Sequence, residues 1–212
     1  NLAERPARIK GEYSMLRQVP VGIDLQEHRL VGIVGGDNKA GAYPIVYNLA
    51  AQIVTQNCYT EVKLIFIGNG EEAEEKWNFA LWVPHVWSED KKLRYVAFCE
   101  SEARDVFYEL TNTLRRRTED KDSGPQRQDR QGPYYIMFID DMQSVAGEAI
   151  EKYIYSQDEN AGLTTVLLAE RYEQLPNACE FIIQNDGYFQ GIYDVRKGET
   201  ERKTLSFDEV SL

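Results

Sequence analysis

The 212-residue sequence predicts an α/β domain with a mainly parallel sheet, helices on both faces and a short antiparallel edge. Two observations support this fold class. Apolar runs of strand length alternate with stretches of helical period, and the runs are almost continuously apolar, as in strands buried on both faces. The last runs follow one another without helices between them, which favours antiparallel pairing at one edge of the sheet.

The apolar runs define the strands in chain order. Strands are expected at 19–25, 30–34, 62–67, 93–98, 134–139 and 163–169, with shorter ones at 181–183, 187–195 and 204–207. Between them, four stretches place apolar side chains on one helical face. These faces comprise Ile45, Val46, Leu49, Ala50, Ile53 and Val54; then Ala73, Trp77, Ala80 and Leu81; then Ala103, Val106, Phe107, Leu110 and Leu114; and finally Ala149, Ile150, Tyr153 and Ile154.

The extent of this pattern suggests the domain organisation. We expect one domain over 19–212, preceded by an N-terminal extension or linker at 1–18. The stretch 118–133 has no apolar period and many turn-forming residues, so we expect a mobile surface loop there. The sequence starts without Met, and we interpret it as a segment of a longer protein.

Composition and charge exclude several functions. Lys and Arg number 24 against 35 Asp and Glu, a formal net charge of −11, whereas nucleic-acid binding uses a basic stripe. We therefore expect no nucleic-acid partner. Cys58, Cys99 and Cys179 are far apart and show no metal-ligand spacing, which predicts small buried thiols and no metal site. No apolar run approaches the roughly 20 residues of a membrane span.

The first candidate site is a glycine loop between the expected strand 30–34 and the helix that follows it. Gly36 and Gly41 have the spacing of a P-loop, G-x-x-x-x-G-K-[ST], in the required strand–loop–helix context. However, Ala42 stands where a lysine would reach the β- and γ-phosphates, and Tyr43 stands where Ser or Thr would hold magnesium. Each missing charge-assisted hydrogen bond is worth about 1.5–3 kcal/mol. The loop is therefore interpreted as a degenerate nucleotide loop.

Two charged residues inside the loop strengthen this interpretation. Asp37 adds a negative charge where phosphate oxygens would lie. Lys39 lies in mid-loop and is out of register for the missing lysine, although a bent loop would bring it round.

The second candidate site follows the apolar run 134–139. Asp140 and Asp141 end this run in the manner of a Walker B strand, in which one carboxylate orients magnesium and the next polarises water. Together with the glycine loop they suggest a P-loop NTPase ancestor. Arg171, directly after the expected strand 163–169, is a candidate interface residue that would reach a neighbour's phosphate; a surface ion pair with Glu170 or Glu173 is the alternative.

Several stretches of the sequence also resemble a known family. PVGIDL and RLVGIVG near the beginning are similar to an early module of the EssC (YukB) family of FtsK/SpoIIIE-type ATPases, the motors of Firmicutes type VII secretion. The resemblance continues through 57–64, 82–91, 162–168 and 175–185, and it covers most of the chain from residue 20 onward.

This resemblance implies a RecA-like fold at the cytoplasmic face of the cell membrane, with transmembrane segments outside this stretch. It further implies tandem ATPase modules as neighbours, a hexameric motor and the export of WXG100 proteins. Ala42 and Tyr43 depart from the active pattern of the family. The favoured function is therefore a non-hydrolysing structural or regulatory module that needs no cofactor. The alternative is an atypical NTPase module that binds Mg-ATP through the backbone amides of 36–41.

Overall fold

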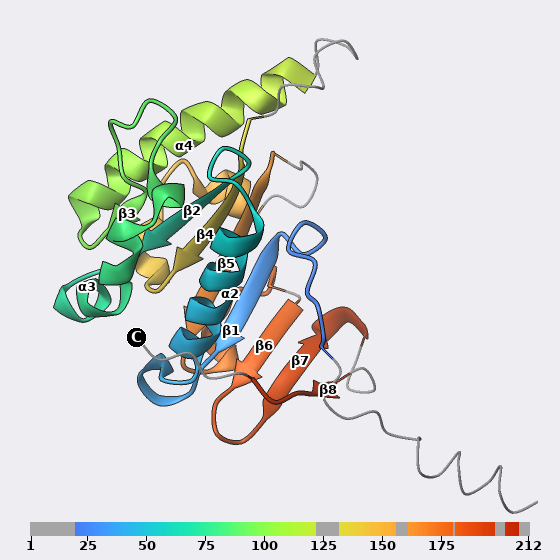
Figure 1. Cartoon of the computed structure of the whole chain (residues 1–212). Coiled ribbons are helices and arrows are strands. Elements are labelled where there is room, and N and C mark those ends of the chain that lie inside the picture. The colour runs from blue at the N-terminus through green and yellow to red at the C-terminus, as the bar shows by residue number, and fades with distance from the viewer. Residues whose placement is uncertain (1–19, 122–131, 156–160, 180, 198–201, 208–212) are drawn as a thin grey trace, which may run out of the picture.

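The computed structural model describes residues 20–121, 132–155, 161–179, 181–197 and 202–207 (Figure 1). Its strands are β1 (Leu30–Val34), β2 (Val62–Ile67), β3 (Val96–Ala97), β4 (Tyr134–Ile139), β5 (Leu163–Ala169), β6 (Phe181–Asn185), β7 (Gln190–Asp194) and β8 (Lys203–Thr204). Its α-helices are α2 (Ala42–Gln56), α3 (Glu71–Trp77), α4 (Glu100–Lys121) and α5 (Glu151–Tyr155). Short 3-10 helices are η1 (Asp37–Lys39), η2 (Asn78–Trp82), η3 (Pro84–Val86), η5 (Met142–Val145), η6 (Tyr172–Gln174) and η7 (Val195–Lys197).

The strands form one sheet in the order β3-β2-β4-β5-β1-β6-β7-β8. All neighbours from β3 to β6 are parallel, and β7 and β8 complete the sheet as antiparallel strands. The predicted fold class, including its antiparallel edge, is confirmed. Strand β5 lies between β1 and β4, so the strand before the glycine loop and the acid-ended strand are separated by one strand.

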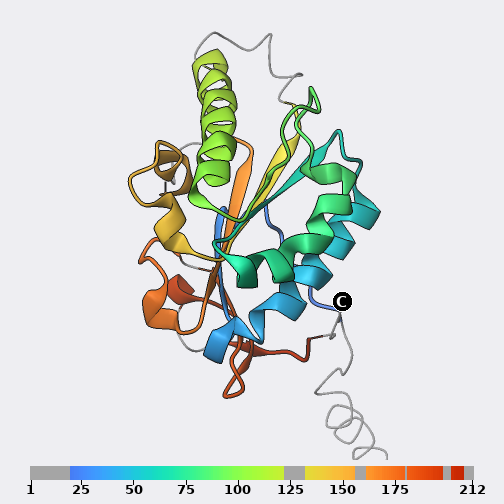
Figure 2. The same cartoon turned by 90° about the vertical axis from the view of Figure 1, so that its left-hand side faces the viewer.

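Helices cover both faces of the sheet, and each face has its own apolar core (Figure 2). On one face, Phe107 and Leu110 of α4 pack with Ile154 of α5. On the other face, Val46 of α2 packs with Trp77 of α3. The strands carry apolar side chains on both surfaces, which explains why their sequences read as nearly continuous apolar runs.

The expected strand at 19–25 is wrong over its described residues, 20–25. This segment forms no strand and leads into a turn at 25–27. The Asp24 carboxylate accepts hydrogen bonds from the amides of Gln26, at 2.8 Å, and Glu27, at 3.4 Å. A side chain that caps its own turn in this way competes with strand pairing.

The expected strand at 93–98 is reduced to β3, which pairs with β2 only through Val96 and Ala97. Leu93 and Tyr95, in the first half of the expected strand, instead form hydrogen bonds with the preceding segment, 86–88. The Ser88 amide donates to the Leu93 carbonyl at 2.9 Å, and the Tyr95 amide donates to the Val86 carbonyl at 2.6 Å. Half of the apolar run therefore pairs with the preceding turn instead of the sheet.

The expected loop at 118–133 begins too early, because Thr118–Lys121 belong to α4. Arg117 anchors this end of the helix: its guanidinium donates to the carbonyls of Pro133, at 2.9 Å, and Ala161, at 3.3 Å, and lies 4.8 Å from the centre of the Tyr135 ring. Residues 122–131, like the expected extension at 1–18, lie outside the described residues. In the described part of the chain, no helix is long and apolar enough to cross a membrane.

Candidate functional site

The glycine loop and the acid-ended strand meet at the carboxyl edge of the parallel strands. The loop joins β1 to α2, and Asp140 directly follows β4. Parallel strands present their carboxyl ends at one edge, which is where α/β sheets bind ligands. The structure thus brings together the two candidate sites that the sequence predicted separately.

The loop has a tight and specific backbone path. Gly36 has φ of +72°, while Asn38 and Lys39 have φ of +52° and +55°, in the left-handed region. At Gly41, an added Cβ would lie 1.8 Å from the Asn185 carbonyl oxygen, so only glycine fits there. The Asn185 side-chain amide donates to the Gly41 carbonyl at 3.0 Å, which fastens the loop to β6.

The amides of this loop donate to acceptors within the protein. In a working P-loop these N–H groups cradle phosphate oxygens. Here the Asn38 amide donates to a carboxylate oxygen of Glu170 at 3.1 Å. Four further loop amides donate to backbone carbonyls: Gly36 to Glu170 (3.1 Å), Lys39 to Gly36 (2.8 Å), Ala40 to Asp37 (3.2 Å) and Gly41 to Gly35 (2.8 Å). Glu170 thus supplies the negative charge that a phosphate would bring.

The Asp140 carboxylate is likewise paired inside the protein. The Lys39 ammonium donates to Asp140 Oδ1 at 2.9 Å and to the Asp140 carbonyl oxygen at 2.6 Å. The Tyr43 hydroxyl donates to the same carboxylate, at 3.2 and 3.3 Å from its two oxygens. Burial, and then the negative charge of Asp140, raise the pKa of Tyr43, so its phenol stays protonated as a donor. The Lys39 ammonium and the Tyr43 phenol therefore occupy the oxygens with which Asp140 would bind magnesium in a Walker B strand.

The two positions that differ from a P-loop are core positions in this fold. Ala42 is fully buried beneath the loop. The Tyr43 ring lies 5.5 Å from Trp77 and 6.5 Å from Tyr47, centre to centre. Side chains that would contact nucleotide in a P-loop therefore fill the apolar face between α2 and α3.

Mg-ATP does not fit the residues of this edge. Five of the loop amides bond to Glu170 or to backbone carbonyls, and the Lys39 ammonium bonds to the Asp140 carboxylate. Asp37 is exposed on the loop and adds further negative charge. Binding a triphosphate would require breaking the Lys39–Asp140 pair and expelling the Glu170 carboxylate, whose charge repels phosphate.

Two predicted site residues have other positions. Asp141 caps η5, its carboxylate accepting from the Gln143 amide at 2.9 Å. Arg171 is exposed directly after β5, and the described residues give it no ion pair, so the predicted pair with Glu170 or Glu173 does not form. The amides of Glu170 and Arg171 donate instead to the side chain of Gln174, at 2.8 and 3.2 Å.

Sequence reasoning missed the role of Glu170. The signal was present, because Glu170 follows β5 as Asp140 follows β4, and acids at adjacent strand ends lie close together in a parallel sheet. The expectation of buried thiols was wrong for Cys58 and Cys99, which are exposed, and correct for Cys179. Over the described ranges, no three His, Cys, Asp or Glu side chains form a group that could hold a metal ion.

The strand order and the helices on both faces are those of a RecA-like α/β domain, and the glycine loop, here called the closed loop, bonds to the protein's own side chains. No protein-family model matches the chain. Two curated proteins are similar along its whole length. The ESX secretion system protein EccC of Geobacillus thermodenitrificans is 22% identical over 211 residues, covering 100% of this chain and 14% of EccC. The ESX secretion system protein YukB of Bacillus subtilis is 23% identical over 212 residues, covering 98% of this chain and 13% of YukB.

A solved structure supports the fold. The cytoplasmic domain of the Thermomonospora curvata type VII secretion ATPase EccC superposes with a TM-score of 0.51 at 15% sequence identity, over 71% of this chain and 17% of that one. The predicted resemblance is confirmed: the curated relatives are EccC and YukB, and the solved structure with the same fold belongs to a type VII secretion ATPase, EccC. The chain spans about one seventh of the length of these curated relatives.

Proposed function

We propose that this chain is a non-hydrolysing structural or regulatory module of a type VII secretion motor. The observation that carries the proposal is the Asp140 carboxylate, which is bonded to Lys39 and Tyr43 where an active module needs it for magnesium. The Glu170 carboxylate on the loop amide of Asn38 supports the same conclusion from the other side of the loop.

The proposal extends to the setting of the module. Its partners are the neighbouring ATPase modules of the same longer chain, which together form a hexameric motor that handles secreted WXG100 proteins. Transmembrane segments outside this stretch anchor the motor to the cell membrane. Arg171 is exposed beside the closed loop and is the residue proposed to contact a neighbouring module.

The test is a nucleotide-binding measurement. A ligand present at 100 times its dissociation constant stabilises a protein by about 2.7 kcal/mol, which would raise the unfolding midpoint of a chain of this size by roughly 5–10 °C. With 5 mM Mg-ATP we expect a shift indistinguishable from that caused by 5 mM Mg-AMP. Equilibrium dialysis that gives a micromolar dissociation constant for Mg-ATP would refute the proposal and favour the atypical NTPase.

A further inference from the structure

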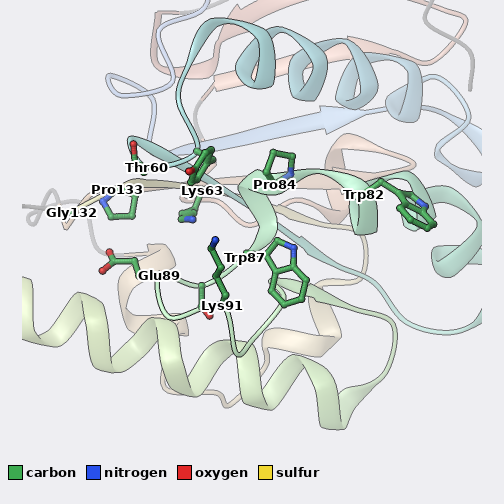
Figure 3. A pocket seen from close by; sticks show the side chains of 11 residues that line it. Thr60, Lys63, Trp82, Pro84, Trp87, Glu89, Lys91, Gly132 and Pro133 are labelled. Atoms are coloured by element: carbon green, nitrogen blue, oxygen red, sulfur yellow. The ribbon is translucent and has the colours of Figure 1, made fainter.

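A cavity of about 870 Å³ opens at the amino edge of the sheet, at the opposite ends of the strands from the glycine loop (Figure 3). Its walls come from three segments: the residues just before β2, the 82–91 stretch around η3, and the residues just before β4. Its volume falls within the range of about 300–1,000 Å³ that is typical of small-molecule sites. The residues that line it are Tyr59, Thr60, Lys63, Trp82, Pro84, Trp87, Ser88, Glu89, Lys91, Gly132 and Pro133.

Lys63 is the unusual member of this lining. It lies in β2, paired in register with Tyr135 of β4, and is only 4% exposed. Its ammonium has no hydrogen-bond or ion-pair partner among the described residues, and its nearest aromatic contact is the Tyr59 ring, 5.6 Å away. Burial lowers the pKa of Lys63. The Glu89 carboxylate raises the pKa of Lys63 but forms no ion pair with it, so the partly desolvated ammonium faces the cavity with room for a further anion.

The other charges of the cavity leave room for one anion. Figure 3 shows the Lys63 and Lys91 side chains converging from opposite walls, while Glu89 lies to one side. Two ammonium groups face one carboxylate, in a protein whose net charge is −11. This local excess of one positive charge matches a monoanion better than a polyanion such as a nucleotide triphosphate.

Besides the polar Thr60 and Ser88, the remaining lining includes the indole rings of Trp82 and Trp87. The Trp87 ring is held from behind by Arg94, whose guanidinium lies 4.5 Å from the ring centre. Trp82 is 86% exposed, and Figure 3 shows it at one end of the cavity. Rigid indole and proline surfaces favour planar aromatic groups, which stack on them.

We propose that this cavity is a binding site for an organic monoanion with a planar aromatic body, whose carboxylate lies between Lys63 and Lys91. The site is separate from the closed loop, so the proposal stands whether or not the module binds nucleotide. The chemistry is shared by free aromatic carboxylates and by a peptide that ends in an aromatic residue with a free carboxylate.

The test compares charged and neutral ligands of the same shape. Calorimetry or ligand-observed NMR on the whole chain measures the affinity of 2-naphthoate and of its neutral isostere 2-naphthamide. We expect the carboxylate to bind at least about 10-fold more tightly, as a charge-assisted hydrogen bond requires. N-acetyl-tryptophan and its amide form the second pair, which reports whether the carboxylate of a peptide terminus is also accepted.

The Lys63→Met variant identifies the residue responsible. We expect it to bind the two naphthalene ligands within about twofold of each other, because the charge that separates them is gone. Lys76→Met is the matched control, since Lys76 also lies 5.6 Å from a tyrosine ring, that of Tyr43, but on α3 and outside the cavity. It should keep the full preference.

Three results would overturn the proposal: equal affinity of the unmodified chain for both ligands, no saturable binding at millimolar concentration, or an unchanged preference in a folded Lys63→Met variant. Should Lys63→Met not fold, Lys91→Asn provides the same test. Asparagine tolerates the left-handed backbone at position 91, where φ is +57°. Loss of at least about threefold in the charge preference supports the proposal, and full retention overturns it.

Discussion

Replacing Lys39 by Met removes the cation that pairs with Asp140 and leaves the strand-end carboxylate with the Tyr43 hydroxyl alone. The Lys39 and Asp140 side chains are only 23% and 10% exposed. Breaking a fully buried pair costs about 3–5 kcal/mol. Because Lys39 is partly exposed and Tyr43 still donates, we expect a loss of about 1.5–3 kcal/mol. For a chain of this length that corresponds to a fall in the unfolding midpoint of roughly 3–12 °C.

The assay is urea denaturation of a double-mutant cycle with Asp140→Asn. The interaction energy of the pair should be about 1–2 kcal/mol, since the two side chains are in direct contact. Arg104→Met is the control: Arg104 forms exposed ion pairs with Glu100 on α4 and, at 3.5 Å, with Glu148, and its removal should cost about 1 kcal/mol or less. Two results would show that this ion pair does not close the loop. One is a loss of unfolding free energy in Lys39→Met no larger than in Arg104→Met; the other is an interaction energy below about 0.5 kcal/mol in the cycle.

Three further outcomes are expected. Lys63→Met should raise the free energy of unfolding at pH 7 by up to about 1 kcal/mol in urea denaturation, because it removes a partly desolvated charge that has no ion pair. Since burial lowers the pKa of Lys63 in the folded state, the unmodified chain should gain stability as pH rises toward the ordinary lysine value of 10.5, and the variant should lack that gain. The double substitution Ala42→Lys and Tyr43→Thr should not create Mg-ATP binding in equilibrium dialysis, and it should lower stability by about 3 kcal/mol because it empties an aromatic core position. At micromolar concentration the chain should sediment as a monomer near 24.4 kDa, since copies with a net charge of −11 repel each other; a stable hexamer of this stretch alone would contradict that expectation.

The fold could be predicted where burial determines the sequence. Strands β2, β4 and β5 have the expected bounds because each is a continuous apolar run that is buried on both faces and ends at a polar residue or a glycine. The prediction failed at 20–25, where Pro20, Gly22 and Asp24 interrupt the apolar residues, the run lacks a partner strand and Asp24 closes a turn. Whether such a run pairs depends on what lies beside it in space, and local pattern does not contain that information.

The site could be predicted in its location but only partly in its chemistry. Glycine spacing and the acids after β4 located both halves of the edge. The contact between Lys39 and Asp140 depends on left-handed backbone at two consecutive non-glycine residues, which sequence rules treat as rare. Without that bend, Lys39 is out of register and the carboxylate lacks its cation. The contribution of Glu170 has a different origin: its position after an apolar strand is visible in the sequence, but its contact with the glycine loop depends on β5 lying between β1 and β4.

The contacts of the closed loop depend on one another, so no single substitution is expected to free the loop for nucleotide. Lys39 neutralises Asp140, Tyr43 donates to the same carboxylate and packs on Trp77, and Glu170 accepts from the loop amide. Each contact makes the next less costly, because Asp140 without Lys39 would be a buried carboxylate with no counter-ion, and the half-exposed Glu170 carboxylate would lose its amide donor. Restoring one P-loop residue therefore leaves the other contacts in competition with nucleotide. The same network links the carboxyl ends of β1, β4 and β5, which supports the proposal that this edge has a structural role.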